Sequence, residues 1–212
     1  MTAPDPNTRF WSRTARKYAA SAIGDPAGFE RTLERVRELV PAGSALFEFG
    51  CGTGTAALKL ASHAGRILAT DISGEMIAIA REKAAAEGVS NLTFEIGTAE
   101  DTRWGEGQFD AAVGFNILHL VPDRPATLAG IRRLLKPGGL FISKSVSLAE
   151  MNPMIRLAIP LMRALGKAPY VDTVTEARLV SEIETAGFEI TSRERHGAKG
   201  KDVRPVIIAR KI

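Results

Sequence analysis

The sequence predicts an α/β fold in which a doubly wound, mostly parallel sheet carries helices on both faces. Three observations lead to this expectation. Short apolar runs that read as strands alternate with helical segments between residues 45 and 146, and a glycine-rich turn at residues 50–54 follows the first run. The chain ends in two further strand-like runs, 188–195 and 203–210, joined by a glycine-containing loop. Alternation indicates parallel strand–helix–strand units, and the last two runs indicate an antiparallel hairpin.

Length and composition fit one globular domain. The chain has 212 residues, of which 45% are hydrophobic and 25% charged, and this suits a single packed core. No stretch approaches the roughly 20 apolar residues of a membrane span, and residues 1–18 lack the apolar centre of a signal peptide. The only cysteine, Cys51, excludes a disulfide framework. We therefore expect a cytoplasmic protein.

The glycine-rich turn and the strand after it predict a pocket for a nucleoside cofactor. Gly50, Gly52 and Gly54 let the chain turn sharply and approach a ligand closely, where a side chain would obstruct it. Residues 55–62 read as a helix whose N-terminal amides would face the same point. Asp71 ends the next apolar run, 66–71. A carboxylate at that position can accept both hydroxyl groups of a ribose.

The spacing of this turn disfavours a dinucleotide. The dinucleotide fingerprint needs a third glycine or alanine at position 55, where this chain has Thr55. Glu48 lies two residues before the first glycine. Its charge would repel a pyrophosphate but suits a cationic group such as an α-amino group. A glycine-rich turn without a ligand, as in any α/β domain, is the alternative.

These residues resemble the first motif of the class I S-adenosylmethionine-dependent methyltransferases, an acidic residue followed by x-G-x-G-x-G. The Lys-Pro-Gly-Gly sequence at residues 136–139 is a second similarity, and matching features run from residue 48 to residue 146. The resemblance implies a Rossmann-like, seven-stranded sheet with a C-terminal antiparallel hairpin. It also implies that S-adenosyl-L-methionine is the cofactor and S-adenosyl-L-homocysteine the product.

The resemblance also assigns the cofactor-binding residues. The family often has Asp at the position of Thr98, so the adenine amino group would be held here by Thr98, Glu100 or Asp101. Tyr18 would close over the methionine end of the cofactor, or alternatively be a packing residue. Asn116 would line the methyl-transfer site through its backbone. The expected cofactor-binding residues are Tyr18, Glu48, Gly50, Cys51, Gly52, Gly54, Asp71, Ile72, Met76, Thr98, Ala99, Glu100 and Asn116.

The segment after the fourth strand narrows the choice of methyl acceptor. Enzymes that methylate exocyclic amines of bases carry Asn/Asp-Pro-Pro-aromatic there, whereas this chain has Asn116 followed by Ile-Leu-His. We therefore expect no DNA partner, and a small-molecule acceptor of the kind used by the ubiquinone/menaquinone-biosynthesis type of methyltransferase. The alternatives are a non-catalytic S-adenosylmethionine-binding module and methylation of a lipid or an RNA.

His119 is the candidate general base, needed only where the acceptor must lose a proton. A packing or hydrogen-bonding role is the alternative for this histidine. Three histidines and one cysteine show no metal-ligand spacing, so no metal site is expected.

Acidic and basic residues are unevenly distributed along the chain. Residues 46–110 hold 5 Lys/Arg against 10 Asp/Glu, and residues 111–212 hold 16 against 9. An acidic cofactor half suits a sulfonium cation. The basic half would suit an anionic acceptor, a lipid surface or RNA, and a simply solvated face is the alternative.

We expect four parts within the single domain 1–212. Residues 1–40 form an N-terminal helical segment, and 45–146 form the cofactor-binding core, with a helix at 124–135, a Pro-Gly turn and a strand at 140–146. Residues 147–174 form an insertion whose apolar stretch, 155–167, caps an apolar acceptor pocket, contacts a second copy in a homodimer or contacts a membrane. Residues 175–212 form a helix and the terminal hairpin.

Overall fold

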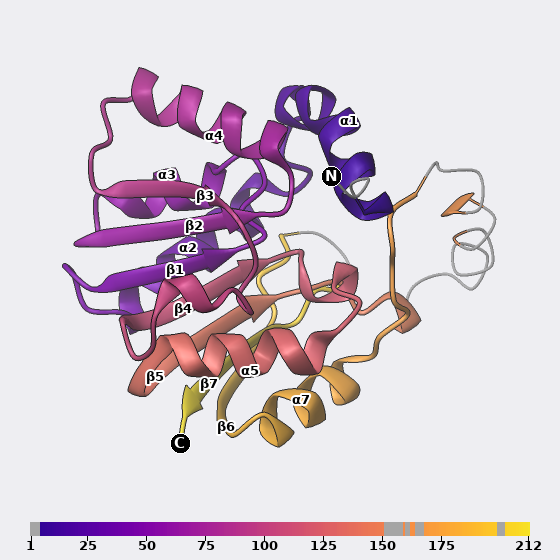
Figure 1. The fold of residues 1–212 in the computed structure, drawn as a ribbon. Helices are drawn as coiled ribbons and strands as arrows, with labels where there is room; N and C mark the ends of the chain where they lie inside the picture. The colour runs from indigo at the N-terminus through magenta and orange to yellow at the C-terminus, as the bar shows by residue number, and fades with distance from the viewer. Residues whose placement is uncertain (1–4, 151–158, 160–161, 164–167, 199–201) are drawn as a thin grey trace.

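A seven-stranded sheet forms the centre of the molecule in the computed structural model, which describes residues 5–150, 159, 162–163, 168–198 and 202–212. The strand order is β3-β2-β1-β4-β5-β7-β6 (Figure 1). The strands are β1 (Ala45–Phe49), β2 (Arg66–Asp71), β3 (Leu92–Ile96), β4 (Phe109–Phe115), β5 (Leu135–Lys144), β6 (Phe188–Glu194) and β7 (Val206–Lys211).

The pairing of the strands confirms the predicted fold class. The first five strands pair in parallel, while β7 is antiparallel to both β5 and β6. The chain proceeds from β1 outward to β3 on one side and from β4 outward on the other. Ligands of such sheets bind at the carboxyl ends of the strands, where the order reverses. That point lies between β1 and β4.

Helices cover both faces of the sheet (Figure 1). The α-helices are α1 (Pro6–Ala20), α2 (Pro26–Leu39), α3 (Thr55–Ala61), α4 (Gly74–Ala86), α5 (Arg124–Leu134) and α7 (Glu176–Thr185), and the short 3-10 turns are η1 (Thr102–Trp104), η2 (Leu118–Leu120) and η3 (Leu148–Glu150).

Two hydrophobic clusters hold these layers together. Leu33 of α2 and Ile77 of α4 pack with Leu46 of β1 on one face. Leu128 of α5 packs with Phe47 of β1 on the opposite face. Because successive side chains of a strand point to opposite faces, Leu46 and Phe47 serve different clusters.

Local sequence explains where the helices begin. The side chains of Asp5, Asp25, Ser73, Asp123 and Thr175 each accept a hydrogen bond from a backbone N–H of the first turn. Proline follows each of the capping residues of α1 and α2 directly, where its missing N–H costs nothing.

The predicted start of β5 is wrong. The prediction placed a Pro-Gly turn before a strand at 140–146, whereas α5 ends at Leu134 and β5 begins at once and runs to Lys144. Leu135 pairs with Phe109, and the pairing resumes at Leu140 with Ala111. The Lys-Pro-Gly-Gly residues therefore form an irregularity inside the strand pairing. The strand β7 likewise begins at Val206, three residues later than expected.

Most of the predicted apolar stretch 155–167 lies outside the described residues, so its role as a cap, a dimer contact or a membrane contact stays a prediction. The described ends of the insertion meet the core. The backbone N–H of Asp172 donates to the carbonyl of His119 (2.8 Å), and Val174 is fully buried. Within the part of the chain that the structure describes, no helix is long and apolar enough to cross a membrane.

Candidate active site

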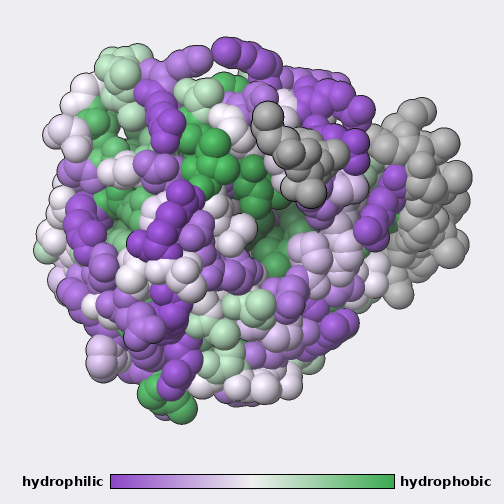
Figure 2. Space-filling view, viewed as in Figure 1, coloured by the Kyte–Doolittle hydropathy of each residue, from purple (hydrophilic) through white to green (hydrophobic). Residues whose placement is uncertain are grey.

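Two neighbouring cavities lie at the carboxyl ends of β1, β2 and β4. The first has a volume of about 470 Å³ and the second about 300 Å³. Five residues line both cavities: Tyr18, Gly50, Gly52, Phe115 and Asn116. The cavities therefore meet beside the glycine turn. In Figure 2, hydrophobic residues are visible in a hollow on this side of the molecule, framed by hydrophilic ones.

The glycine turn has the conformation that its sequence predicts. Gly50, Gly52 and Gly54 all have positive φ, at 64°, 53° and 76°. A Cβ at Gly54 would lie 2.5 Å from the ring of Phe94, so glycine is needed there for packing. A Cβ at Gly52 would meet only the ring of Tyr18, at 3.7 Å. The backbone at Gly52 therefore faces open space beneath Tyr18.

Asp71 lies in the wall of the first cavity and is fixed by the backbone. Its Oδ2 accepts from the N–H of Gly52 (2.9 Å), and its Oδ1 accepts from the N–H of Ser73 (2.9 Å). Burial raises the pKa of this carboxyl, and these two hydrogen bonds oppose the rise. The backbone N–H of Ile72 also donates to this carboxylate. A carboxylate has about four acceptor sites, so the three backbone bonds leave acceptor capacity for a ligand.

Glu48 is a buried carboxyl in the wall of the second cavity. It accepts a hydrogen bond from the backbone N–H of Ala57, while its Oε2 has no partner among the described residues. Burial, assisted by the negative charge of Asp71, raises the pKa of Glu48 to about 8. The group is therefore mostly protonated at neutral pH, and a cation bound beside it would favour its ionised form.

The loop after β3 places Glu100 in the wall of the first cavity, and one of its carboxyl oxygens has no partner among the described residues. Glu100 lines this cavity and accepts a hydrogen bond from the Thr127 hydroxyl through Oε1, whereas its buried Oε2 has no partner among the described residues. Of the three residues proposed for the adenine amino group, Thr98 also lines the cavity. Asp101 does not, because it caps η1 and pairs with Arg103 at 2.9 Å.

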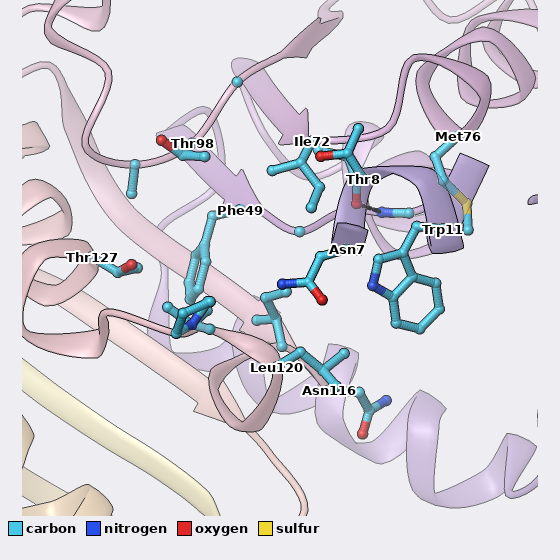
Figure 3. Close-up of a pocket in the computed structure, with 18 of the residues that line it drawn as sticks. Asn7, Thr8, Trp11, Phe49, Ile72, Met76, Thr98, Asn116, Leu120 and Thr127 are labelled. Atoms are coloured by element: carbon cyan, nitrogen blue, oxygen red, sulfur yellow. Dashed lines mark hydrogen bonds between the residues drawn. The ribbon is translucent and has the colours of Figure 1, made fainter. Parts of the chain in front are cut away.

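The helix α1 contributes residues that the sequence did not single out. Asn7, Thr8 and Trp11 line the first cavity together with Ile72 and Met76. Figure 3 shows Asn7 and Trp11 reaching in from α1 on the side opposite Thr98 and Thr127. Three aromatic residues, Phe10, Trp11 and Tyr18, mark this helix in the sequence, but which of its faces meets the core depends on packing against α4.

Tyr18, at the end of α1, joins the two cavities. Its ring lies edge-on to Trp11, with 6.3 Å between the ring centroids. Burial of the hydroxyl and the negative charges of Asp71 and Glu48 raise the pKa of Tyr18. The residue is 51% exposed, so it covers the cavities and is not a core residue.

Asn116 follows β4 with a φ of 57°, and it is the only described residue other than glycine with positive φ. This conformation is uncommon for a residue with a side chain, though Asn tolerates it better than most. Its N–H donates to the carbonyl of Lys144 (2.6 Å). The sequence left open a role for either the amide or the carbonyl, and the amide is taken up by this bond.

Comparison with known proteins identifies the family. The chain matches the family described as methyltransferase domain over residues 46–139. It is 30% identical over 190 residues to the ubiquinone biosynthesis O-methyltransferase of Xanthomonas axonopodis pv. citri, covering 86% of this chain and 76% of that protein. The chain belongs to the S-adenosylmethionine-dependent methyltransferases. It is also 34% identical over 166 residues to the ubiquinone/menaquinone biosynthesis C-methyltransferase of Brucella anthropi, covering 66% of this chain and 62% of that protein.

Solved structures share the fold of this methyltransferase. A S-adenosylmethionine-dependent methyltransferase from Aquifex aeolicus superposes with a TM-score of 0.72 at 16% identity, covering 98% of this chain and 99% of the other. The [4+2]-cyclase SpnF superposes with a TM-score of 0.70 at 21% identity, covering 86% and 80%. A cyclase with this architecture illustrates that the fold alone does not define the reaction.

The structure brings most predicted site residues of the methyltransferase together. Ile72, Met76, Thr98, Ala99 and Glu100 line the first cavity, and Cys51 lines the second. Gly54 lines neither cavity and starts α3 in a left-handed conformation. Burial raises the pKa of the Cys51 thiol well above its usual value, which disfavours a nucleophilic role.

His119 lies outside the residues that line the two cavities. It belongs to η2 and is 8% exposed, and its Nδ1 has no partner among the described residues. Burial lowers its pKa to about 4, so the ring is neutral at pH 7. A neutral imidazole can accept a proton, but this position gives it no contact with either cavity. Among the described residues, no cluster of His, Cys, Asp or Glu that could hold a metal ion is present.

Proposed function

We propose that this methyltransferase transfers the methyl group of S-adenosylmethionine to a small phenolic or quinone-precursor acceptor. The observation that carries the proposal is the position of Asp71 in the wall of the first cavity beside the glycine turn, with both oxygens oriented by backbone N–H groups and acceptor capacity left for a ligand. The relatives named for ubiquinone and menaquinone biosynthesis support the acceptor class.

The residues of both cavities fit the cofactor chemically. Asp71 would accept the ribose hydroxyls, and the unpartnered Oε2 of Glu100 would accept the adenine amino group. Glu48 and the carbonyl of Asn116 would face the cationic amino-acid end, beneath Tyr18. The cofactor, when bound, supplies an activated methyl group on a sulfonium.

The chain's own contribution is mainly placement and exclusion of water. Trp11 and Tyr18 cover the cavities from α1, and the glycine turn brings backbone close to the ligand. A general base is required only where the acceptor loses a proton during methyl transfer. His119 is the candidate base for that step.

Calorimetric titration with S-adenosylmethionine, with NAD as the control titrant, tests the cofactor. Saturable binding of S-adenosylmethionine alone is expected, and binding of NAD alone would contradict the proposal. Transfer of a labelled methyl group to catechol-type acceptors then tests the reaction. Cofactor binding without turnover on any acceptor would favour the non-catalytic binding module. We also propose a cytoplasmic location, for which cell fractionation is the test.

A further inference from the structure

The second cavity is lined by a buried lysine, Lys144, that makes no ion pair with a described carboxylate. Lys144 is the last residue of β5 and is 5% exposed. Its Nζ donates to the carbonyl of Gly28 (3.1 Å) and to the hydroxyl of Thr32 (3.0 Å), both neutral groups of α2. An ammonium has three N–H donors, so one remains for a ligand.

Another buried cation of the same protein shows the usual arrangement. Arg124 is 3% exposed and makes ion pairs with both Asp172 and Glu182. Lys144 lies within ion-pair distance of no carboxylate among the described residues, yet it lines a cavity. Burying an unpaired charge is costly, and an anionic ligand in the cavity would offset that cost.

Charged groups of both signs surround Lys144, and Asp25 also lines this cavity. Arg204 also lines it and is held by Asp25 (3.4 Å) and Asp202 (3.1 Å). Asp25 in addition accepts from the N–H groups of Gly28 and Ala198, so its charge is already well compensated. Burial lowers the pKa of Lys144, and the positive charges of Arg204 and Arg31 lower it further, whereas the negative charges of Asp202 and Asp25 raise it.

The position of Lys144 separates it from the cofactor's own charges. Glu48 is on β1 and Lys144 on β5, with β4 between them. Adjacent strands lie about 4.8 Å apart, so the two backbones are about 10 Å apart across the sheet. The Lys144 ammonium is held in place by its hydrogen bonds to Gly28 and Thr32 of α2. Both side chains line the second cavity, but Glu48 is not among the charges that shift the pKa of Lys144, nor Lys144 among those that shift the pKa of Glu48. Because the amino and carboxylate groups of the cofactor share one carbon, this separation favours a second molecule as the partner of Lys144.

Apolar side chains also line the second cavity. Phe29 of α2 and Phe115 of β4 line the second cavity, and Phe115 and Asn116 also line the first. Lys144 adjoins this junction, because its carbonyl accepts the N–H of Asn116. An aromatic ring between Phe29 and Phe115 would thus carry a charged group toward Lys144 and a reactive atom toward the junction.

We propose that Lys144 binds the carboxylate of an aromatic methyl acceptor and thereby sets acceptor specificity. This inference rests on the proposed function. Lys144 is an acceptor-binding residue in this assignment, and Arg204 contributes charge at the rim of the same cavity.

The test compares 3,4-dihydroxybenzoate with its methyl ester, by calorimetry on the complex with S-adenosylhomocysteine and by methyl transfer. The wild-type enzyme is expected to bind the acid at least tenfold more tightly than the ester, as is typical of a charge-assisted hydrogen bond. Lys144→Met should remove this preference by raising KM for the acid, with little effect on the ester. Lys144→Arg should restore part of the preference.

Lys211→Met is the matched control, because the Lys211 ammonium also donates to a neutral carbonyl, that of Leu135 (2.7 Å), but lies outside both cavities. It should keep the preference for the acid. Equal affinity of the wild type for acid and ester, no binding of either, or a preference retained in Lys144→Met would overturn the proposal. Should Lys144→Met not fold, Lys144→Gln provides the same comparison.

A further titration distinguishes the acceptor from the cofactor as the source of the carboxylate. S-adenosylmethionine and 5′-methylthioadenosine, which lacks the amino-acid part, should each bind Lys144→Met as they bind the wild type. Weakened binding of S-adenosylmethionine alone would assign Lys144 to the cofactor and overturn the proposal. Failure of the wild type to bind S-adenosylmethionine would instead contradict the proposed function.

Discussion

The two cavities differ in how the chain builds them. The first is organised by short-range elements: the glycine turn, Asp71 at the end of β2 and the loop after β3, whose polar groups are oriented by nearby backbone. The second brings together α2, the end of β5 and the segment before β7, and its cation Lys144 is held by residues more than 100 positions away. In the proposed assignment, most cofactor contacts therefore come from residues 48–100, whereas the contact to the acceptor depends on segments that only the tertiary fold brings together.

The largest expected change in cofactor affinity comes from the substitution Asp71→Ala in the first cavity. It should weaken S-adenosylmethionine binding by tenfold or more, because hydrogen bonds to a charged group contribute about 1.5–3 kcal/mol each. Calorimetry gives the dissociation constant. Asp101→Ala is the control, since Asp101 is a neighbouring carboxylate that lines neither cavity. Unchanged affinity in folded Asp71→Ala would contradict the placement of the ribose.

A somewhat smaller change in cofactor affinity is expected when the pH changes, because Glu48 titrates. Its pKa of about 8 lies above the ordinary value of 4.5, so the empty site holds a proton that a bound ammonium would displace. Wild-type affinity for S-adenosylmethionine should therefore rise several-fold between about pH 6 and pH 8.5. Glu48→Gln cannot ionise and should show a flatter profile, which also corrects for titration of the cofactor itself. Parallel profiles would remove Glu48 from the cofactor site.

Glu100 offers a finer test at the opposite end of the first cavity. Glu100→Leu should weaken S-adenosylhomocysteine by about fivefold, the contribution of one hydrogen bond. It should leave S-inosylhomocysteine, which lacks the amino group of adenine, nearly unchanged. Thr98→Val measures the competing hydroxyl contact in the same titration. If both ligands weaken equally in Glu100→Leu, the carboxyl does not hold the amino group.

The smallest change in kcat is expected from substitution of His119. Because it lines neither cavity, His119→Gln should leave kcat within about twofold for an acceptor that is methylated without losing a proton. A phenolic acceptor provides the contrast. If kcat for the phenol falls at least tenfold in His119→Gln while cofactor affinity is unchanged, His119 takes part in proton removal. Normal rates on both acceptors would exclude it from the reaction.

The same contrast explains which parts of the fold and of the site could be predicted from the sequence. The fold class and the glycine turn were predictable, because strand periodicity and positive-φ glycines are local properties. Asp71 was predictable for the same reason. The start of β5 was not, since the Lys-Pro-Gly-Gly residues suggest a turn between elements, and pairing of Leu135 with Phe109 overrides that preference.

Site residues far apart in sequence were harder to find. Lys144 carried no motif, and its significance depends on Thr32 and Gly28 of α2 lying beside it. Trp11 and Asn7 belong to a helix whose orientation follows from packing against α4. His119 shows that a chemically suitable residue after a strand need not line the cavities, and its role as a general base stays a prediction.

The attachment of α1 has a consequence for access to the cavities. Of its fifteen residues only Ala15 is buried, and its apolar contacts are confined to a small cluster with Met76 and Ile79 of α4. Its polar contacts to α4 include an exposed ion pair between Arg16 and Glu82. Elements held by so few buried contacts open at lower free energy than the sheet does. We therefore expect α1 to detach without unfolding of the sheet, and its detachment would open both cavities to solvent, because Trp11 and Tyr18 line them.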